Sequence, residues 1–502
     1  MDTQGAFQKD FASDLPESEQ QVPSNTSVMT TDMSDNQEQP PSNPPNVLLS
    51  PSEQDGTDTF DCASLLSRSS SFLSDHSETS TIKYTGEPFT EFKTKVEKLC
   101  ENLWPPPKSM SRLVATRLRA NKLLRSLMPP PKGPVVEVER LKGGDYNRIT
   151  SISLPNSYGH ATSKLILRTS RWEESAGRPD RDVAILDFVS QRTIIPVPRV
   201  IAKDFSNDNA LEMPYVVQSR VPGSDLDSMW AEFSHQQRCV IACEMGLVIK
   251  SLLSVESPVP GLIDAASAGT VFADFPNIVP FELRDSSGDF IDDRTVSGDM
   301  ATPQTTGELF KMVFGKWHAY TLDDDDRETE LFRELLETVC DMDNMGGFPT
   351  DMHCLCHVDL HSRNVMAEVQ PDDDIKITAV LDWDEAVFAP KFVNCQPPWW
   401  LWKEDGDERL DENGFETWPY ELPSPKSFPA TPENQELKRL FEENAGAEYR
   451  YLATDTCSRL GRVLFILAKD GLNSNEHFKA AERVVSEWKE VRKSLKGQEV
   501  DL

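Results

Sequence analysis

The chain has 502 residues, a hydrophobic content of 38% and a formal net charge of -32. Its length allows two or more hydrophobic cores, whereas the low hydrophobic content indicates that part of the chain does not fold. The charge argues against nucleic acid as a partner, because a phosphate backbone repels an acidic protein.

Cysteine usage and the N-terminus give an expectation for the compartment. The nine cysteines are scattered and form no CxxC pair, which predicts free thiols in a reducing environment. No apolar run approaches the ~20 residues that span a bilayer, so no transmembrane segment is expected. The first twenty residues are acidic and lack the basic and apolar regions of a signal peptide. We expect a cytoplasmic protein, and the nucleus remains an alternative.

Residues 1–80 are rich in Ser, Gln, Pro, Asp and Thr, and their only basic residues are Lys9 and Arg68. Such a segment buries too little apolar surface to offset the entropy lost on ordering. The composition predicts a disordered tail, for which protein partners remain open.

Residues 81–133 are predicted to form a helical extension. Five apolar residues recur there at helical spacing: Phe89, Phe92, Val96, Leu99 and Leu103. The prolines at 105–107 end this helix. The following stretch, 108–132, contains Lys and Arg and no acidic residue. We favour a helix packed on the acidic body of the protein over a membrane or partner surface.

Residues 134–220 show the alternation and turn residues of β-strands. Strands are expected near Val135–Val138, Ile152–Leu154, Lys164–Arg168, Ile195–Val200 and Tyr215–Arg220. A helical pattern covers Asp182–Arg192. This order predicts a small antiparallel sheet with one helix on it.

Residues 221–502 have a mainly helical pattern. Helices are expected over Val240–Leu253, Glu308–Val313, Leu331–Val339, Leu460–Ala468 and Phe478–Val491. The predicted fold class is therefore α+β, with a small antiparallel sheet lobe, a larger mainly helical lobe and the tail.

One short region of the helical lobe carries recognisable chemistry. Asp359 is followed five residues later by Asn364, and Asp382 comes after an apolar strand. A phosphoryl-transfer site needs one carboxylate to orient or deprotonate a hydroxyl, and an amide and a second carboxylate to hold Mg²⁺ against nucleotide phosphates. The spacing predicts such a site.

Five motifs in this order resemble the aminoglycoside phosphotransferase and choline kinase family, in particular its fungal branch of predicted phosphotransferases. They are Gly143–Arg148, Thr193–Arg199, His357–Asn364, Leu381–Asp384 and Pro397–Trp402. The resemblance covers about residues 85–490 and implies a two-lobed protein-kinase-like fold. It implies nucleotide binding by the sheet lobe, 134–220, and catalysis and substrate binding by the helical lobe, 221–502.

The resemblance also implies roles for individual residues. Asp359 becomes the catalytic base or the group that orients the acceptor, while Asn364 and Asp382 become the Mg²⁺ ligands. His357 is expected to brace the loop by hydrogen bonding. Asp384 is given no role, since it is either a supporting group or a surface residue.

The nucleotide side departs from the wider fold, in which a strand Lys pairs with a helix Glu. Here Arg168 stands in the Lys position and Asp182 in the Glu position, and a longer Arg offsets a shorter Asp. Gly143 and Gly144 are expected to approach phosphate through their N–H groups, with a further contact from Asn147 or Arg148. Gln218 begins a linker that presents main-chain groups to adenine.

The leading interpretation is a Mg²⁺-dependent kinase that transfers phosphate from ATP to a small-molecule hydroxyl on an amino alcohol, a sugar or a secondary metabolite. The alternative is a pseudokinase, a nucleotide-binding scaffold with a regulatory tail. A protein kinase is disfavoured because Trp383 replaces the Phe of Asp-Phe-Gly and no Ala-Pro-Glu follows. Trp399, Trp400 and Trp402 form either an aromatic wall for a cationic amine or part of the core.

Overall fold

A computed structural model describes residues 87–105, 136–141, 147–154, 164–170, 178–267, 276–285, 287–291, 300–323, 326–402 and 429–499. Three predicted features lie outside these residues: the tail 1–80, the basic stretch 108–132, and the pair Gly143 and Gly144. Among the described helices, none is both long and apolar enough to cross a membrane.

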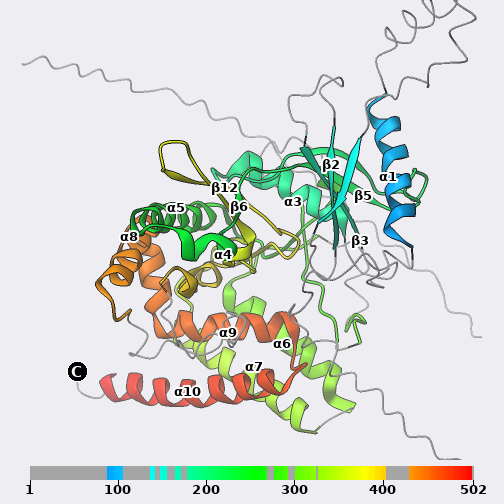
Figure 1. Cartoon of the computed structure of the whole chain (residues 1–502). Coiled ribbons are helices and arrows are strands. Elements are labelled where there is room, and N and C mark those ends of the chain that lie inside the picture. The colour runs from blue at the N-terminus through cyan, green and yellow to red at the C-terminus, as the bar shows by residue number, and fades with distance from the viewer. Residues whose placement is uncertain are drawn as a thin grey trace, which may run out of the picture. The chain divides into compact units, whose positions relative to one another are not determined.

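The predicted small sheet is present and entirely antiparallel (Figure 1). Its five strands are β1 (Glu137–Arg140), β2 (Asn147–Ser153), β3 (Lys164–Ser170), β4 (Val200–Asp204) and β5 (Tyr215–Ser219), in the spatial order β1-β2-β3-β5-β4. Along β3, Leu165 and Leu167 point to the buried face, and Arg168 lies on the opposite face because side chains alternate along a strand. This alternation directs Arg168 away from the core of the sheet.

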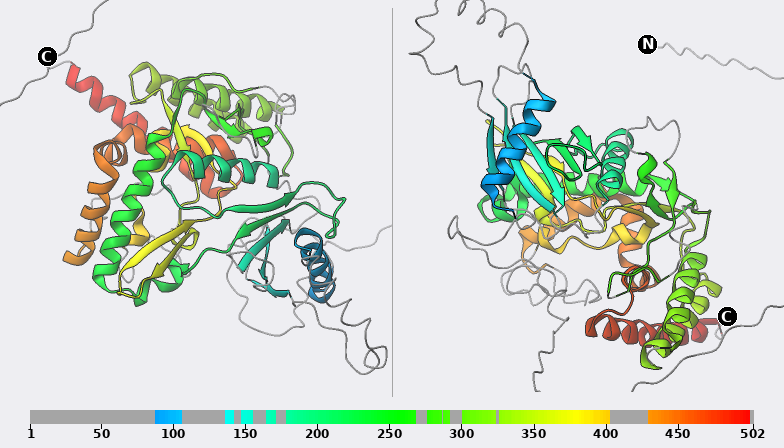
Figure 2. Two further views of the ribbon diagram at one scale, coloured as in Figure 1. Left: turned by 90° about the horizontal axis from the view of Figure 1, so that it is seen from above. Right: turned by 90° about the vertical axis from the view of Figure 1, so that its right-hand side faces the viewer.

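Helix α1 (Phe89–Leu103) covers the buried face of this sheet (Figures 1 and 2). Phe92, Val96 and Leu99 follow helical spacing and are at most 3% exposed, packed with Leu167 and Val217 of the sheet. Fully burying such a side chain contributes about 1.5–3 kcal/mol. The stripe predicted from the sequence is thus the contact surface of the helix.

Helix α3 (Pro179–Arg192) begins with a proline at its first position, a residue whose fixed φ suits a helix start. It starts earlier than the predicted Asp182, which places Asp182 in the first turn. Phe188 meets Phe388 edge to face with ring centroids 5.9 Å apart. The helix contacts β4 and β5 but contributes its buried side chains to the core of the helical lobe, so it connects the two parts.

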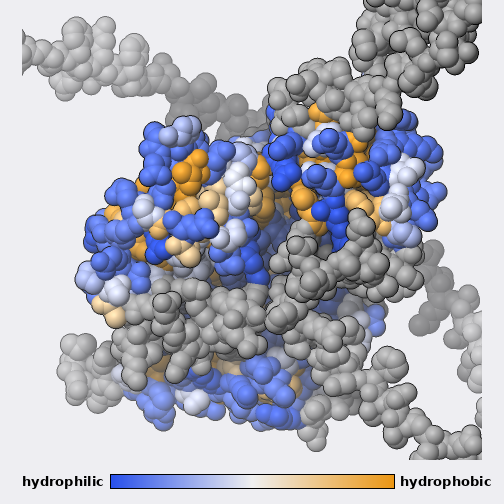
Figure 3. All heavy atoms as spheres, in the orientation of Figure 1, coloured by the Kyte–Doolittle hydropathy of each residue, from blue (hydrophilic) through white to orange (hydrophobic). Residues whose placement is uncertain are grey.

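The larger lobe contains seven further α-helices among the described residues: α4 (Leu226–Met229), α5 (His235–Ser254), α6 (Thr306–Tyr320), α7 (Asp326–Asn344), α8 (Pro432–Thr454), α9 (Thr456–Asp470) and α10 (Asn475–Glu499). The five helices expected from the sequence are all present and longer than predicted, whereas α4 and α8 were not predicted. The face drawn in Figure 3 is mainly hydrophilic where described residues cover it.

Two small sheets also lie in this lobe; the sequence predicted the apolar strand before Asp382 but not the sheets as a whole. One has the order β7-β10-β13-β8-β9, and the other β12-β11-β6. Their strands are β6 (Ser224–Asp225), β7 (Glu256–Ser257), β8 (Gly261–Ile263), β9 (Ile278–Val279), β10 (His353–Cys356), β11 (Val365–Val369), β12 (Ile375–Val380) and β13 (Val387–Pro390). Most have only two to six residues, too few for a period-two pattern to stand out.

The tryptophan cluster belongs to the core. Trp399, Trp400 and Trp402 are 9%, 8% and 2% exposed. Trp400 packs edge to face on Trp230, and Trp402 packs on Phe441. Of the two interpretations left open by the sequence, the structure supports packing over an aromatic wall.

Candidate active site

The loop after β10 is held by its first residue, His357, which is 1% exposed. Its Nε2 lies 2.8 Å from the carbonyl oxygen of Leu381, and its ring packs on Trp383 with centroids 4.5 Å apart. Burial lowers the pKa of His357, so the neutral ring donates Nε2–H to that carbonyl. The expected bracing role of His357 is therefore seen, and its partner is the loop after β12.

Asp359 and Asn364 are joined directly. The Asn364 side-chain amide donates to the Asp359 carboxylate and to the Asp359 carbonyl oxygen, both at 2.9 Å. This arrangement uses the nitrogen of Asn364 and leaves its amide oxygen as a ligand atom for a cation. Asn364 closes a short 3₁₀ turn, Ser362–Asn364, that leads into β11.

His361, which had no predicted role, is the second partner of Asp359, with Nε2 3.0 Å from its carboxylate. Burial alone raises the pKa of Asp359, but the hydrogen bonds from His361 and Asn364 outweigh it and lower the pKa to about 2. Asp359 is consequently ionised at neutral pH and suited to accept a hydrogen bond from a hydroxyl.

Two residues of the site have a left-handed backbone. Val358 has φ 69° and Asp382 has φ 61°. This region is sterically costly for residues with a side chain, above all for a β-branched one such as Val358. The main chain is held there by contacts between the two loops, including Leu381 N–H to the Asn364 carbonyl oxygen at 2.7 Å. Strain of this kind is typical of functional sites.

Arg168 brings the sheet lobe to the same place. Its guanidinium donates to Asp384 at 2.7 Å and approaches Asp382 at 3.5 Å. Asn147 of β2 also donates to Asp384, at 3.0 Å. Asp384, for which the sequence predicted no role, therefore accepts hydrogen bonds from Arg168 and Asn147, two side chains predicted to bind phosphate.

The expected ion pair between Arg168 and Asp182 does not form among the described residues, which corrects the sequence-based analogy. Asp182 instead lies near Asp384, and burial, followed by the charge of Asp384, raises the pKa of Asp182 well above its usual range. Asp384, at 2.7 Å, is the nearest carboxylate to Arg168 among its ion pairs, and Asp182 acts on Arg168 through its charge.

The donor atoms suit a hard divalent cation. Asn364 and Asp382 offer oxygen ligands, and Asp382 is half exposed. Burial, together with the Asp384 charge, raises the pKa of Asp382 to about 6. The Oδ1 atom of Asp384 is buried and has no hydrogen-bond donor among the described residues. A concentration of carboxylates with an unmatched oxygen is what Mg²⁺ binding relieves.

Two other predicted contacts take a different form. Gln218 is buried within β5, between β3 and β4, so its main chain belongs to the sheet and not to the connecting segment. Arg148 is 4% exposed and lies over the Phe92 ring at 5.9 Å, on the α1 side of the sheet. Of the two residues offered for phosphate, Asn147 faces the site and Arg148 does not.

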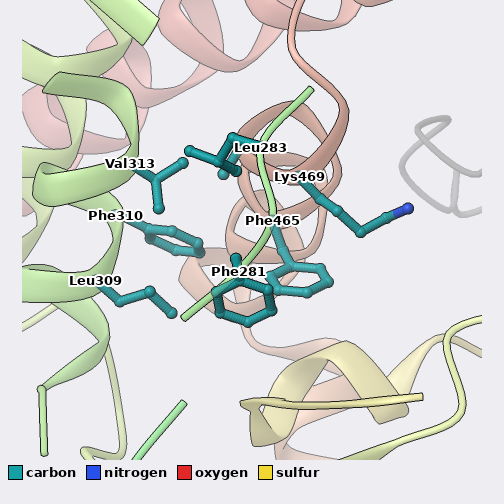
Figure 4. Close-up of a pocket in the computed structure, with 8 residues that line it drawn as sticks. Phe281, Leu283, Leu309, Phe310, Val313, Phe465 and Lys469 are labelled. Carbon is teal, nitrogen blue, oxygen red and sulfur yellow. The ribbon is translucent and has the colours of Figure 1, made fainter. Parts of the chain in front are cut away.

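A small apolar pocket lies between α6, α9 and the segment before residue 285 (Figure 4). It is lined by Phe281, Leu283, Leu309, Phe310, Val313, Phe465, Ala468 and Lys469. Its interior of about 10 Å³ is the space of roughly one water molecule. The pocket is too small for an acceptor, although its lining residue Lys469 reaches Glu385, beside Asp384, at 3.3 Å.

Comparison with known proteins identifies the family. The sequence model described as "Phosphotransferase enzyme family" matches residues 156–422, more than half of the chain. No curated protein matches the chain.

Similar solved structures include two aminoglycoside phosphotransferases and a choline kinase. A thermostable mutant of aminoglycoside phosphotransferase APH(4)-Ia (N202A), in a ternary complex with AMP-PNP and hygromycin B, is 16% identical with a TM-score of 0.38 over 74% of this chain and 99% of that one. ADP-bound aminoglycoside phosphotransferase APH(2'')-Ib is 11% identical, with a TM-score of 0.37 over 74% and 96%. Choline kinase from Cryptosporidium parvum Iowa II is 11% identical, with a TM-score of 0.36 over 78% and 97%. These scores are low, so the assignment rests on the family match.

Proposed function

The chain belongs to the phosphotransferase enzyme family, and we propose that it transfers the γ-phosphoryl group of ATP to a hydroxyl of a small molecule, with Mg²⁺ as the metal. The observation that carries the proposal is the direct bond between Asp359 and Asn364, on a loop joined through His357 to the Asp382 loop. The proposed base and the two proposed metal ligands would thereby be held in position by hydrogen bonds between the two loops.

Asp359 would accept the hydrogen bond of the acceptor hydroxyl and aim its oxygen at the γ-phosphorus. A new oxygen–phosphorus bond forms while the bond from the γ-phosphorus to the bridging oxygen breaks, and ADP leaves with that electron pair. The acceptor proton passes to Asp359 and then to solvent. A carboxylate with a pKa of about 2 is a weak base, which fits a loose transition state in which positioning matters more than early proton removal.

Asn364 and Asp382 would hold the metal through the amide oxygen and the carboxylate. Held by these two residues, Mg²⁺ would supply positive charge to offset that of the nucleotide phosphates. Arg168 would contact the phosphates, since a guanidinium binds phosphate oxygens in a bidentate manner. Asn147 and the predicted turn at Gly143 and Gly144 would approach the phosphates from the sheet lobe.

The acceptor is proposed as an amino alcohol, a sugar or a secondary metabolite. Support comes from the family match, whose description is that of phosphotransferases. A cytoplasmic location is proposed on the eight cysteines of the described region, all free thiols. The pseudokinase alternative is weaker, because a scaffold has no need to hold Asp359, Asn364 and Asp382 in this geometry.

The test compares the full chain with Asp359→Asn, and with Asp351→Asn as a matched control at an exposed carboxylate just before β10. In Asp359→Asn, loss of the positioned base is expected to lower the rate of phosphoryl transfer, or of the slow background hydrolysis of ATP, by about 10²–10⁴-fold. Mg-ATP should still raise the melting temperature of this variant. Asp351→Asn should match wild type in both measurements. No stabilisation of wild type by millimolar Mg-ATP or Mg-GTP would overturn the proposal.

A further inference from the structure

A second cluster of ligand-type side chains lies in the helical lobe and shares no residue with the candidate active site. It consists of His235 and Cys239 on α5 and Glu436 on α8, whose ligand atoms all lie within 4.8 Å of one another. His235 Nε2 is 2.9 Å from the Glu436 carboxylate and 3.4 Å from the Cys239 sulfur. A nitrogen, a sulfur and an oxygen therefore converge on one point.

The helix scaffold fixes these positions. His235 and Cys239 are four residues apart and so share one face of α5. The helix start is held by a capping box in which Ser234 and Gln237 bond each other's main chain. Glu436 lies near the start of α8, where the Thr431 side chain accepts from the Asn434 N–H. The starts of α5 and α8 are thus both capped by side chains of the protein itself.

Close helix packing sets the distance across the cluster. Helices α5 and α8 lie side by side (Figures 1 and 2). They approach at Gly246, where a Cβ atom would lie only 2.5 Å from the Phe441 carbonyl oxygen. Only a glycine permits this separation, which brings Glu436 within reach of the α5 side chains.

The donor set matches zinc, and the distances from His235 to its two partners are close to those that zinc requires. Imidazole nitrogen, thiolate sulfur and carboxylate oxygen are the usual Zn²⁺ ligands, whereas Mg²⁺ prefers oxygen alone. Tetrahedral Zn²⁺ with bonds of about 2.0–2.3 Å separates its ligand atoms by about 3.3–3.8 Å. The spacing between His235 and Cys239 is already in this range. Glu436 needs to move away from His235 by only a few tenths of an ångström, and its side chain is 47% exposed.

We propose that His235, Cys239 and Glu436 bind Zn²⁺, with solvent water as the fourth ligand, and that the ion links the start of α5 to the start of α8. Water has access because the His235 side chain is 40% exposed, while Cys239 is buried beneath it. The site has a structural role in the helical lobe and does not depend on the proposed phosphotransferase activity.

The test uses the full chain, reduced and freed of metal with a chelator, and titrates it with Co²⁺ and then Zn²⁺. Co²⁺ bound to a thiolate gives a charge-transfer absorption in the near ultraviolet, which Zn²⁺ should abolish at one equivalent. Cys239→Ser should remove the absorption. His235→Ala and Glu436→Gln should each weaken Zn²⁺ binding at least about tenfold, because each removes one of three protein ligands.

The matched control is Cys340→Ser, since Cys340 is also a helical thiol, although only partly buried, and lies outside the cluster. It should retain the absorption, the affinity and a Zn²⁺-dependent rise in melting temperature. Cys239 is buried, so His235→Ala and Glu436→Gln keep the test valid if Cys239→Ser fails to fold. The proposal would be overturned if the Co²⁺ absorption were absent in wild type, or equal in wild type and Cys239→Ser. Unchanged Zn²⁺ affinity in both His235→Ala and Glu436→Gln would also overturn it.

Discussion

Gly223 follows the segment between the two lobes. It provides a test of how that segment is attached to β11, the strand that follows the loop carrying Asp359 and Asn364. It has φ +87°, and a Cβ atom there would overlap the Ala367 carbonyl group, at 2.5 Å from its carbon. Gly288 has the same φ, yet a Cβ atom there would meet nothing within 4 Å. Replacing each by alanine therefore separates backbone strain from steric overlap.

The expected magnitudes follow from this difference. Alanine in the left-handed region costs about 1–2 kcal/mol at either position. At Gly223 the carbonyl of Ala367 must also move, which disturbs the pairing of β6 with β11 at Ser224 and Asp225. Losing one or two main-chain hydrogen bonds adds about 1–3 kcal/mol. We expect Gly223→Ala to destabilise the protein by about 2–5 kcal/mol and Gly288→Ala by about 1–2 kcal/mol.

Urea denaturation of both variants beside wild type measures the loss of stability, and hydrogen exchange locates it. Gly223→Ala should speed amide exchange in β11, the strand that begins directly after Asn364, and lower ATP turnover. Gly288→Ala should leave both unchanged. Equal destabilisation by the two substitutions, with normal protection of β11, would refute the reasoning, because the overlap with Ala367 would then have no energetic consequence.

Three further predictions concern charge and packing. Arg168→Met should raise the KM for ATP about 10–100-fold, since a charge-assisted hydrogen bond contributes about 1.5–3 kcal/mol; steady-state kinetics measure it. Burial lowers the pKa of Lys391, but bonds to Glu256 and Glu448 outweigh burial and raise the pKa above 10.5. The stability that protonated Lys391 gives the folded protein is therefore complete below pH 10.5 and is lost as the pH rises through the folded pKa. Lys391→Met should destabilise the protein by about 2 kcal/mol at pH 7, where both wild-type ion pairs are intact, and the difference in urea midpoint between variant and wild type should shrink at alkaline pH. Gly246→Ala should destabilise by about 1–3 kcal/mol through overlap with α8, whereas Gly315→Ala, in open space on α6, should stabilise by up to about 1 kcal/mol in the same assay.

Local sequence patterns predicted the larger elements because each carries its own periodicity. The stripe from Phe89 to Leu103 predicted a helix there, which is α1, and alternation predicted β3 and β5. The same patterns do not say what an element packs against. The extension containing α1 was separated from the sheet in the prediction, yet Phe92 and Val96 form the core of that sheet. Its partner strands lie far along the chain, and no period in the sequence encodes that contact.

The expected proximity of residues is seen within one loop, whereas the expected contact between Arg168 and Asp182 across the lobes is not among the ion pairs of the described residues. Asp359 and Asn364 are five residues apart, so their spacing alone brought them together. Arg168 and Asp384 are separated by 216 residues, and their pairing depends on how β3 approaches the turn after β12. His361 was missed although it lies within the His357–Asn364 motif, because the spacing of Asp359, Asn364 and Asp382 does not involve it. Asp384 lies two positions after Asp382, a predicted metal ligand, and this spacing of two acidic residues was the signal that could have identified it.

The pairing of Arg168 with Asp384 changes how nucleotide and metal sites are coupled. A Lys–Glu pair ties the phosphate-binding strand to a helix, so that the position of this helix controls the site. Here Arg168 and Asn147 both bond to the loop that carries Asp382. Movement of the sheet lobe would thus be transmitted to the loop that carries Asp382, the proposed metal ligand. Asp182 acts on both Arg168 and Asp384 through its charge. If Arg168 binds phosphate and Asp382 binds the metal as proposed, the two events should be linked, because Asp384 bonds to Arg168 and its charge also raises the pKa of Asp382.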